Sequence, residues 1–191
     1  MSSDQLLYSL PVQSLLAITA YGEAATEGNE GLLAVMNVIK NRTKDPNQFA
    51  DSSILSATQS LYHAVILKPY QFSVFNSNDP GRSRMEKFAA DFPGSYQGDS
   101  ILRSSYDLAG KVLSGSTADN TMGATFYHAD YVLPSWASEI PVIGQIGTHI
   151  FYGYSILAEQ VSKITSNPTS LIWVAVAGML LLIFIKKNKE A

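Results

Sequence analysis

The chain has 191 residues, of which 46% are apolar and 10% aromatic, so it can bury one good-sized core, and nothing in the sequence indicates a second domain. Thirteen Lys and Arg against sixteen Asp and Glu give a net charge of -3, which excludes the basic surface that nucleic acids require, and no nucleic-acid partner is expected. There is no cysteine, so disulfides, thiol nucleophiles and Cys-ligated zinc are excluded, and the three histidines lack the spacing of metal ligands. Neither a metal nor a cofactor is expected.

Apolar residues at helical spacing predict short helices joined by polar loops. The expected helices cover residues 13–20, 29–42 with Asn29 as the cap, 53–67 and 99–113. Residues 69–98 are rich in Pro, Gly, Asn, Ser and aromatic residues, which predicts a long functional loop. The alternation in TFYHADYV, residues 125–132, predicts a strand or an extended pair. These patterns indicate one mainly helical, α+β domain over residues 1–154.

The composition changes abruptly in the C-terminal part of the chain. Residues 155–168 are expected to form a helical stalk, and the stretch LIWVAVAGMLLLIFI, Leu171 to Ile185, carries no charge. These fifteen residues would span roughly 22 Å as a helix, which approaches the hydrocarbon thickness of a bilayer once Thr169, Ser170 and the lysine stems are added. A buried core helix is the alternative. The apolar faces, Trp173 at one end and the lysines at the other favour a transmembrane helix over 169–186 that binds a lipid membrane, followed by a short basic tail, 187–191.

Three glutamates lie between the first two expected helices, in YGEAATEGNEG. Glu27 and Glu30 fall at the start of the second helix, where the free N–H groups favour negative charge. Glu23 lies instead at the C-terminal end of an apolar helix, and both the helix dipole and its apolar sequence neighbours oppose ionisation, as a general acid requires. The alternative role for Glu23 is a carboxylate that caps or hydrogen-bonds a neighbouring turn.

Four segments carry motifs in a fixed order: AYGEAATEGNEGLLAVMNVIKNR from Ala20, QFSVFNSNDP from Gln71, GATFYHADYVLPSWA from Gly123 and IGQIGTHIFYG from Ile143. Together they resemble the SleB-type cell-wall hydrolases, the spore cortex-lytic enzyme family, over residues 13–153. The resemblance implies a lysozyme-like fold that cleaves the bond between N-acetylmuramic acid and N-acetylglucosamine in peptidoglycan, with Glu23 as the catalytic acid. The chain departs from the family pattern at Ala25 and Thr26, where Arg-Gly is common, and at Phe75, where Trp is usual.

Glycoside cleavage ordinarily uses two carboxyl groups. No second acid occupies a fixed motif position; Asp79 is the best candidate, although Asn-Asp-Pro equally predicts a turn. A single carboxyl fits lytic transglycosylation, in which the acid protonates the leaving group and its carboxylate then draws a proton from the muramic acid 6-hydroxyl, giving a 1,6-anhydro product. A muramidase that uses water is the alternative.

Polar and aromatic residues of the motifs are expected to contact the sugars. The candidates for substrate binding are Gln71, Phe72, Ser73, Phe75, Asn76, Tyr127 and Trp136. Core packing is an equal alternative for Phe72 and Trp136, whereas Tyr127 can both hydrogen-bond and pack. His128 and His149 stand beside aromatic residues and are expected to be buried, hydrogen-bonded residues that hold the fold.

Two functions from different classes are compatible with these patterns. One is a membrane-anchored lytic transglycosylase; the other is a catalytically silent structural protein of an envelope or virion that keeps the lysozyme-like fold, because function resides in the site and not in the fold. The intact motif around Glu23 favours the enzyme.

The expected location follows from the two ends of the chain. Lys186, Lys187 and Lys189 would stay cytoplasmic and place the catalytic domain outside, facing peptidoglycan. The N-terminus has no basic start and carries Asp4 and Pro11, so no cleavable signal peptide is expected. A bacteriophage protein in an internal virion membrane, used to open the wall, is therefore slightly favoured over a bacterial envelope protein, and virion or envelope proteins are candidate partners.

Overall fold

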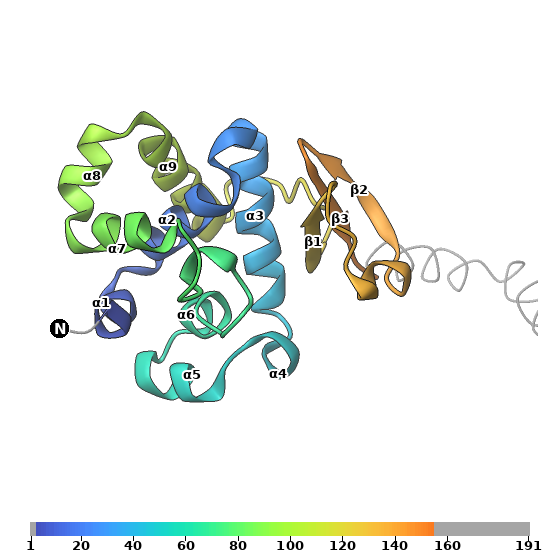
Figure 1. Ribbon diagram of the computed structural model, residues 1–191, viewed down its shortest axis with the longest axis horizontal. Coiled ribbons are helices and arrows are strands. Elements are labelled where there is room, and N and C mark those ends of the chain that lie inside the picture. The colour runs from blue at the N-terminus through green and yellow to red at the C-terminus, as the bar shows by residue number, and fades with distance from the viewer. Residues whose placement is uncertain (1–2, 155–191) are drawn as a thin grey trace, which may run out of the picture. The chain divides into compact units, whose positions relative to one another are not determined.

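The computed structural model describes residues 3–154 (Figure 1). Contacts divide the chain into two units, Met1–Gly153 and Tyr154–Ala191. The expected stalk at 155–168, the expected transmembrane helix at 169–186 and the basic tail at 187–191 lie outside the described residues. Between residues 3 and 154, no helix combines the length and apolarity needed to cross a bilayer.

The first unit is mainly helical with one small sheet, as expected from the sequence. Its α-helices are α1 Ser3–Ser9, α2 Val12–Ala24, α3 Gly28–Arg42, α4 Pro46–Phe49, α5 Ser52–Thr58, α6 Leu61–Ile66, α7 Arg82–Ala90, α8 Phe92–Gly98 and α9 Ser100–Ser114. Short 3-10 turns are η1 Ala25–Glu27, η2 Ser73–Phe75 and η3 Ser135–Ser138. The strands are β1 Phe126–Ala129, β2 Val142–Ile146 and β3 His149–Tyr152, in the spatial order β1-β3-β2.

Helix α2 forms the centre of the core. It packs against α3 and α9, which also pack against each other, and it contacts α6 and α7 as well. Leu15, Leu16 and Ile18 of α2 are completely buried. A helix that is apolar on nearly every face has to be surrounded by other elements, so the other helices gather around α2. This position fixes the C-terminal end of α2, where Glu23 lies.

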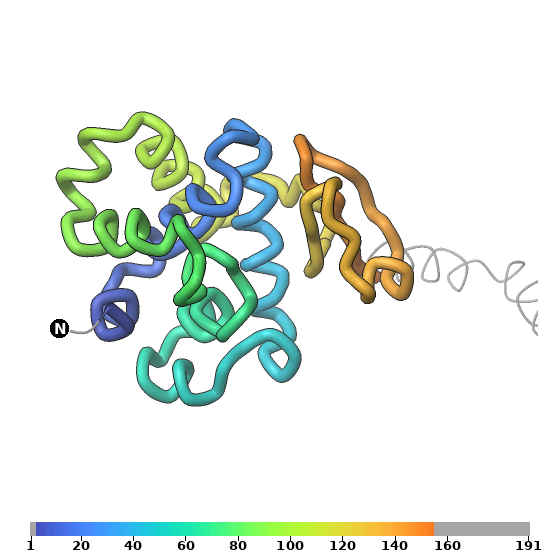
Figure 2. Tube along the Cα trace, viewed as in Figure 1, coloured from blue at the N-terminus to red at the C-terminus, as the bar shows by residue number. Residues whose placement is uncertain are grey.

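Helix α3 contacts the helical core and the sheet at the same time. Leu32 and Met36 belong to the main core, whereas Ala34 and Val38 pack with Phe151 of β3 in a second apolar cluster. Figure 2 shows the three-stranded sheet beside α3. Small residues at 34 and 38 allow this close approach. The sheet is therefore held next to the end of α2 through α3.

The antiparallel sheet presents its two faces to different surroundings. Tyr127 pairs with Phe151, and both rings lie on the face that packs with α3. The neighbouring position Phe126 pairs with Tyr152, and both rings pack against Trp136 of η3 on the other face. The strand expected in TFYHADYV is confirmed at Phe126–Ala129. Its alternation places Tyr127 toward the helices.

The helices expected at 13–20, 29–42 and 99–113 are confirmed with shifted ends. Asp99 caps α9, because its Oδ1 accepts hydrogen bonds from the N–H groups of Ile101 and Leu102. Asn29 does not cap α3, which begins at Gly28 with Glu27 in the capping position. The N-cap residue of α3 is therefore Glu27, one of the three motif glutamates.

The single helix expected over 53–67 is wrong, because two helices occupy the segment. Gln59 has a left-handed φ of 55° and ends α5. Ser60 then accepts a hydrogen bond from the N–H of His63 and begins α6. The helical spacing of apolar residues continues from α5 into α6, so this spacing alone did not predict the break between the two helices.

The long loop expected over 69–98 is wrong for most of its length, because α7 and α8 occupy residues 82–90 and 92–98. Pro93 lies in the first turn of α8, where a missing N–H costs nothing, and Asp91 accepts from the N–H of Gly94 as a cap. Residues that usually indicate loops therefore mark the start of a helix here. Only the part around η2 runs as irregular chain next to the site.

Candidate active site

Glu23 is the penultimate residue of α2 and is only partly buried. Its Oε2 accepts a hydrogen bond of 2.9 Å from the Tyr127 hydroxyl. Its Oε1 is approached by two donors from η2, the Ser73 hydroxyl at 3.3 Å and the Val74 N–H at 3.4 Å. The carboxyl group is thus held between the end of α2, strand β1 and η2.

The sequence predicted apolar surroundings for Glu23, but the groups that contact its carboxyl are polar. Its apolar neighbours Ile18, Tyr21 and Ala24 are buried in the helical core. Glu23 projects from a different side of α2, and its contacts come from segments far away in the chain. The contact with the Val74 N–H also means that Glu23 hydrogen-bonds a neighbouring turn, which was the alternative role considered for it.

A cavity of about 440 Å³ opens in front of Glu23. Its lining includes Arg42 and Gln71, and also Tyr70, Tyr131 and His149, which were not expected there. Tyr70 and Tyr131 are 89% and 83% exposed, so their rings remain available to a ligand. Within the described part of the chain, Glu23 is the only carboxyl-bearing residue of this lining.

Arg42, the last residue of α3, places a buried positive charge behind Glu23. Its Nε donates to the Thr125 carbonyl at 2.7 Å and its Nη1 donates to Gln71 Oε1 at 2.8 Å. Its guanidinium lies over the rings of Phe49 and Phe72, 5.4 and 5.2 Å from their centroids. Burial lowers the pKa of Arg42, but the charges of Tyr127 and Glu23 act in the opposite direction, and guanidinium stays protonated in proteins.

The charge of Arg42 is relevant to Ala25, the position where this chain lacks the arginine that is common in the family pattern. The family commonly has arginine there, whereas in this chain the cation near the carboxyl group comes from Arg42, at the end of the same motif. Sequence reasoning missed Arg42 because a terminal helix arginine is usually exposed. The sequence feature that could have identified Arg42 is its position at the end of the motif that begins at Ala20.

Tyr127 is the residue that ties the sheet to Glu23. Burial and the nearby charge of Glu23 raise the pKa of Tyr127 well above 10, against the influence of Arg42. The phenol therefore remains protonated at neutral pH and acts as a donor. Tyr127 was expected as a sugar contact, and it lines the cavity.

The two histidines of the sheet differ from each other. His128 Nδ1 donates to the Ala129 carbonyl at 2.8 Å and its Nε2 pairs with the Tyr152 hydroxyl at 2.7 Å, so it is the buried, hydrogen-bonded residue that was expected. His149 is also buried, but its Nδ1 has no hydrogen-bond partner among residues 3–154. Its ring meets that of Tyr127 edge to face with centroids 5.3 Å apart, and it lines the cavity. The expectation that His149 is buried is confirmed, but its Nδ1 lacks the expected hydrogen bond within the described residues.

The structure separates the expected sugar contacts into two groups. Gln71, Ser73, Asn76 and Tyr127 line the Glu23 cavity, whereas Phe72, Phe75 and Trp136 do not. Phe72 is only 1% exposed, and its ring packs against the guanidinium of Arg42. It therefore has no exposed face on which a sugar could stack.

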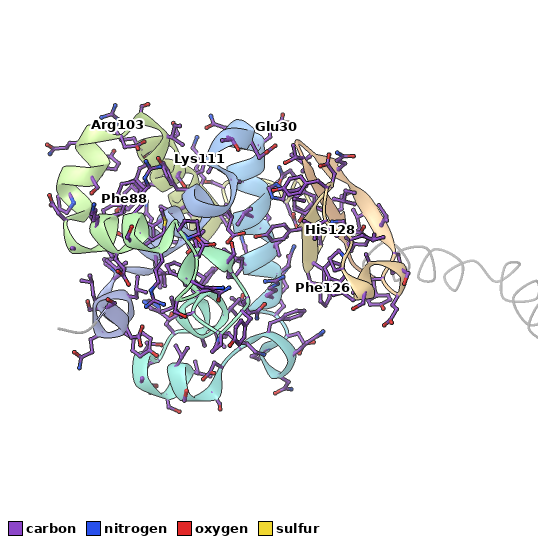
Figure 3. The ribbon with its side chains drawn as sticks, viewed as in Figure 1. Glu30, Phe88, Arg103, Lys111, Phe126 and His128 are labelled. Atoms are coloured by element: carbon purple, nitrogen blue, oxygen red, sulfur yellow. The ribbon has the colours of Figure 1, made fainter. Side chains whose placement is uncertain are left out.

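Phe75 and Trp136 have other surroundings than the Glu23 cavity. Phe75 packs at the edge of the main core. Trp136 packs on Phe126 and His128, which project from β1 in Figure 3.

The other acids of the motifs have structural roles. Asp79 accepts a hydrogen bond of 2.7 Å from the N–H of Gly81 in the turn before α7, and it does not line the Glu23 cavity as a second acid would. Glu27 accepts from the N–H and hydroxyl of Thr148 at 2.9 and 2.8 Å, and these bonds lower the pKa of Glu27, against a smaller effect of burial. Glu30 is exposed in the first turn of α3 (Figure 3). Glu27 thereby fastens the β2–β3 turn to the start of α3.

Comparison with solved structures finds two bacterial catalytic domains. The catalytic domain of the germination-specific lytic transglycosylase SleB from Bacillus anthracis is 22% identical, with 80% of this chain and 96% of that chain covered and a TM-score of 0.48. The catalytic domain of the Bacillus cereus SleB protein is 21% identical, with 74% and 89% covered and a TM-score of 0.44. Comparison with curated proteins gives no match.

Comparison with protein families matches residues 26–152 to the cell wall hydrolases. Glu23 precedes the matched residues, whereas Arg42, Gln71, Tyr127 and His149 lie within them. The match covers more than half of the chain, and it agrees with the order of the four motifs. The chain belongs to the cell wall hydrolase family, of the SleB type that its motifs resemble.

Proposed function

We propose that this protein is a lytic transglycosylase that cleaves the glycan strands of peptidoglycan with Glu23 as both acid and base. The observation that carries the proposal is the composition of the 440 Å³ cavity, where Glu23 is the only carboxyl-bearing residue within the described chain. Hydrolysis with two carboxyl groups requires a second acid across the sugar ring. Membership of the cell wall hydrolase family supports peptidoglycan as the substrate.

In the first step, protonated Glu23 donates its proton to the oxygen that joins N-acetylmuramic acid to N-acetylglucosamine. The bond from the anomeric carbon to this oxygen breaks, N-acetylglucosamine leaves with a new hydroxyl, and positive charge develops on the muramic acid ring. Glu23 is then a carboxylate. Its negative charge stabilises the positive ring next to it.

In the second step, the Glu23 carboxylate takes the proton of the muramic acid 6-hydroxyl. The freed oxygen attacks the anomeric carbon of the same sugar and closes a 1,6-anhydro ring, so Glu23 returns to its protonated state and no water is consumed. The nucleophile is already attached to the reacting ring, which removes most of the entropic cost of bringing it there.

The neighbours of Glu23 suit this exchange of one proton. Tyr127 holds Oε2 with a 2.9 Å hydrogen bond, whereas the donors at Oε1 lie farther away, at 3.3 and 3.4 Å. Oε1 is therefore the oxygen that carries and transfers the proton, and Tyr127 keeps the carboxyl plane fixed while it does so. The buried guanidinium of Arg42 lies close enough to interact electrostatically with Glu23.

The product tests the mechanism directly. Mass spectrometry of peptidoglycan digested by the full chain should find fragments that end in 1,6-anhydro-muramic acid, each lighter by one water than a hydrolysed fragment. Predominantly reducing-end muramic acid would instead identify water as the acceptor and a muramidase. No cleavage under any condition by a folded protein would favour the silent structural protein.

We also propose that residues 169–186 anchor the enzyme in a lipid membrane, with the catalytic domain facing peptidoglycan. The uncharged stretch from Leu171 to Ile185 supports this proposal. Removal of residues 171–191 should convert a protein that requires detergent into one that stays in solution without it, with similar activity on soluble glycan fragments. Aggregation of the shortened protein would contradict the anchor and indicate a helix that the fold needs.

A further inference from the structure

The two oxygens of the Glu23 carboxyl group are held by segments that lie far apart in the chain. Oε2 accepts a hydrogen bond from Tyr127 of β1, whereas Oε1 is approached by Ser73 and Val74 of η2. The carboxyl group therefore has its observed orientation only when β1 and η2 are both correctly placed next to the end of α2.

One buried side chain hydrogen-bonds to both of these segments. Arg42 Nε donates to the carbonyl of Thr125, the residue directly before β1, and its Nη1 donates to the amide oxygen of Gln71, which closely precedes η2. The N–H of Thr125 donates to the Tyr152 carbonyl, so this end of the connection belongs to the sheet. The guanidinium of Arg42 thus connects the sheet to the chain that leads into η2.

Two aromatic rings fix the plane of this guanidinium. Arg42 is only 6% exposed, and its central carbon lies 5.4 Å from the ring centroid of Phe49 and 5.2 Å from that of Phe72. A planar fork that is stacked on rings and donates in two directions keeps one orientation, which the flexible ammonium group of a lysine does not reproduce. Arg42 therefore fixes the distance between its two acceptors in addition to supplying a positive charge.

Gln71 is engaged at both ends of its amide group. Its Oε1 accepts from Arg42 at 2.8 Å, and its Nε2 donates to the Phe49 carbonyl at 2.6 Å. The Phe49 ring in turn contacts the guanidinium of Arg42, so the three residues form a closed set of contacts. This arrangement gives Gln71 a role inside the protein that differs from the sugar contact expected from the sequence.

We propose that Arg42 and Gln71 are positioning residues for Glu23. The hydrogen bond between them holds β1 and η2 at the separation at which the donors of both segments reach the Glu23 carboxyl group, and neither residue has to touch the substrate. The effect on catalysis rests on the proposed function of Glu23, whereas the connection between the two segments does not.

The first test separates positioning from substrate contact. Gln71→Met keeps the length of the side chain but removes both hydrogen bonds. It should lower kcat on soluble glycan fragments by about 10- to 100-fold with KM unchanged, because a small displacement of a catalytic group slows the chemical step. Gln97→Met makes the same change at an exposed position of α8 and should alter neither value. A raised KM with unchanged kcat would show that Gln71 binds the sugar and would overturn the proposal.

A second variant separates the geometry of Arg42 from its charge. Arg42→Lys keeps the positive charge but loses the planar fork, so it should lower kcat about as much as Gln71→Met does. The two losses should not add in the double variant, because both break the same connection. Arg103→Lys, at an exposed position of α9, is the control. Normal kcat in Arg42→Lys would show that only the charge matters and would overturn the proposal.

A third measurement needs no catalysis. The N–H of Val74 approaches Glu23 Oε1, and in full-length Gln71→Met it should exchange with solvent about tenfold faster than in the wild type, as measured by NMR, while the amides of α9 keep their rates. Unchanged exchange at Val74 would overturn the connection.

The combined results distinguish the two proposals. Near-normal activity in Glu23→Gln together with faster exchange at Val74 in Gln71→Met would overturn the proposed function alone. An anhydro product together with normal kcat in both Gln71→Met and Arg42→Lys would overturn the positioning role alone.

Discussion

The Tyr127 hydroxyl donates a 2.9 Å hydrogen bond to Glu23 Oε2 across 104 positions of the chain. This bond joins strand β1 to the end of α2, so the orientation of the Glu23 carboxyl, the proposed catalytic acid, depends on how the sheet packs against the helices. Glu27 contributes to that arrangement, because its bonds to Thr148 fasten the β2–β3 turn to the start of α3. Two motif glutamates thus contact the sheet, Glu23 through Tyr127 and Glu27 through Thr148.

Glu23→Gln should lower the rate of glycan cleavage by about 10²- to 10⁴-fold, which is the usual contribution of a general acid. The amide keeps the side-chain volume and a carbonyl oxygen for the Tyr127 hydroxyl, but it has no proton to transfer. The measurement is release of soluble fragments from peptidoglycan, together with the thermal unfolding midpoint. Glu30→Gln is the matched control, because Glu30 is exposed in the first turn of α3. Near-normal activity of a folded Glu23→Gln protein would refute the assignment of the acid.

Tyr127→Phe should lower kcat by about 10- to 100-fold, because a hydrogen bond to a charged group contributes roughly 1.5–3 kcal/mol. Since burial raises the pKa of Tyr127 well above 10, the phenol stays protonated through the assay range, and its own titration should add no step to the pH profile of the wild type. Tyr152→Phe is the control. It removes a buried hydroxyl that hydrogen-bonds His128 on the other face of the sheet, but it leaves the hydrogen bond between Tyr127 and Glu23 in place. Equal kcat values for the two variants would exclude an orienting role for Tyr127.

Gly22→Ala should reduce activity although alanine favours helices. A Cβ at Gly22 would lie 2.6 Å from Val74 Cγ1, and Val74 is buried and donates its N–H to Glu23, so the η2 turn would have to move. Gly98→Ala is the control, because a Cβ there meets nothing within 4 Å and should stabilise the protein by a few tenths of a kcal/mol up to about 1 kcal/mol. The measurements are kcat and the free energy of unfolding in urea. A variant at Gly22 with normal kcat would show that η2 tolerates displacement.

Asp119→Asn should destabilise the protein by about 1–3 kcal/mol at neutral pH, because buried donors lose a charged acceptor. Burial opposes ionisation of Asp119, but hydrogen bonds from Thr121, Asn41 and the Gly123 N–H outweigh it and lower its pKa below the usual 3.8. A lowered folded pKa stabilises the protein above pH 3.8, and this stabilisation is lost as the pH falls through the folded pKa.

The difference between wild type and Asp119→Asn should therefore be largest at neutral pH and disappear as the pH falls through the folded pKa of Asp119, measured by urea unfolding at several pH values. Asp107→Asn, at an exposed position of α9, should show no such dependence. A difference for Asp119→Asn that stays constant with pH would indicate that the variant alters packing and not charge.

Local patterns were informative where a single segment determines its own structure. The apolar period of residues 99–113 predicted α9, and the helix begins at Ser100 because Asp99 supplies acceptors to its first N–H groups. The same reasoning failed at 69–98, where Asp91 and Pro93 begin a helix although both residue types are also typical of loops. Proline and aspartate satisfy free N–H positions in turns and helix starts alike, so composition alone does not separate the two.

The sequence by itself determined the family, the main helices and the place of Glu23 at the end of an apolar helix, because motif order and helical period are properties of short segments. Only the tertiary structure decided what surrounds that carboxyl: Arg42 beneath it, Tyr127 on Oε2, and the absence of Asp79 and Glu27 from the lining of its cavity. It also decided that Phe72 packs against Arg42 instead of a sugar and that, within residues 3–154, His149 Nδ1 has no hydrogen-bond partner. These relationships depend on the docking of the sheet against α3, and contacts between residues up to 104 positions apart follow from the packing of whole elements and not from the pattern within any one of them.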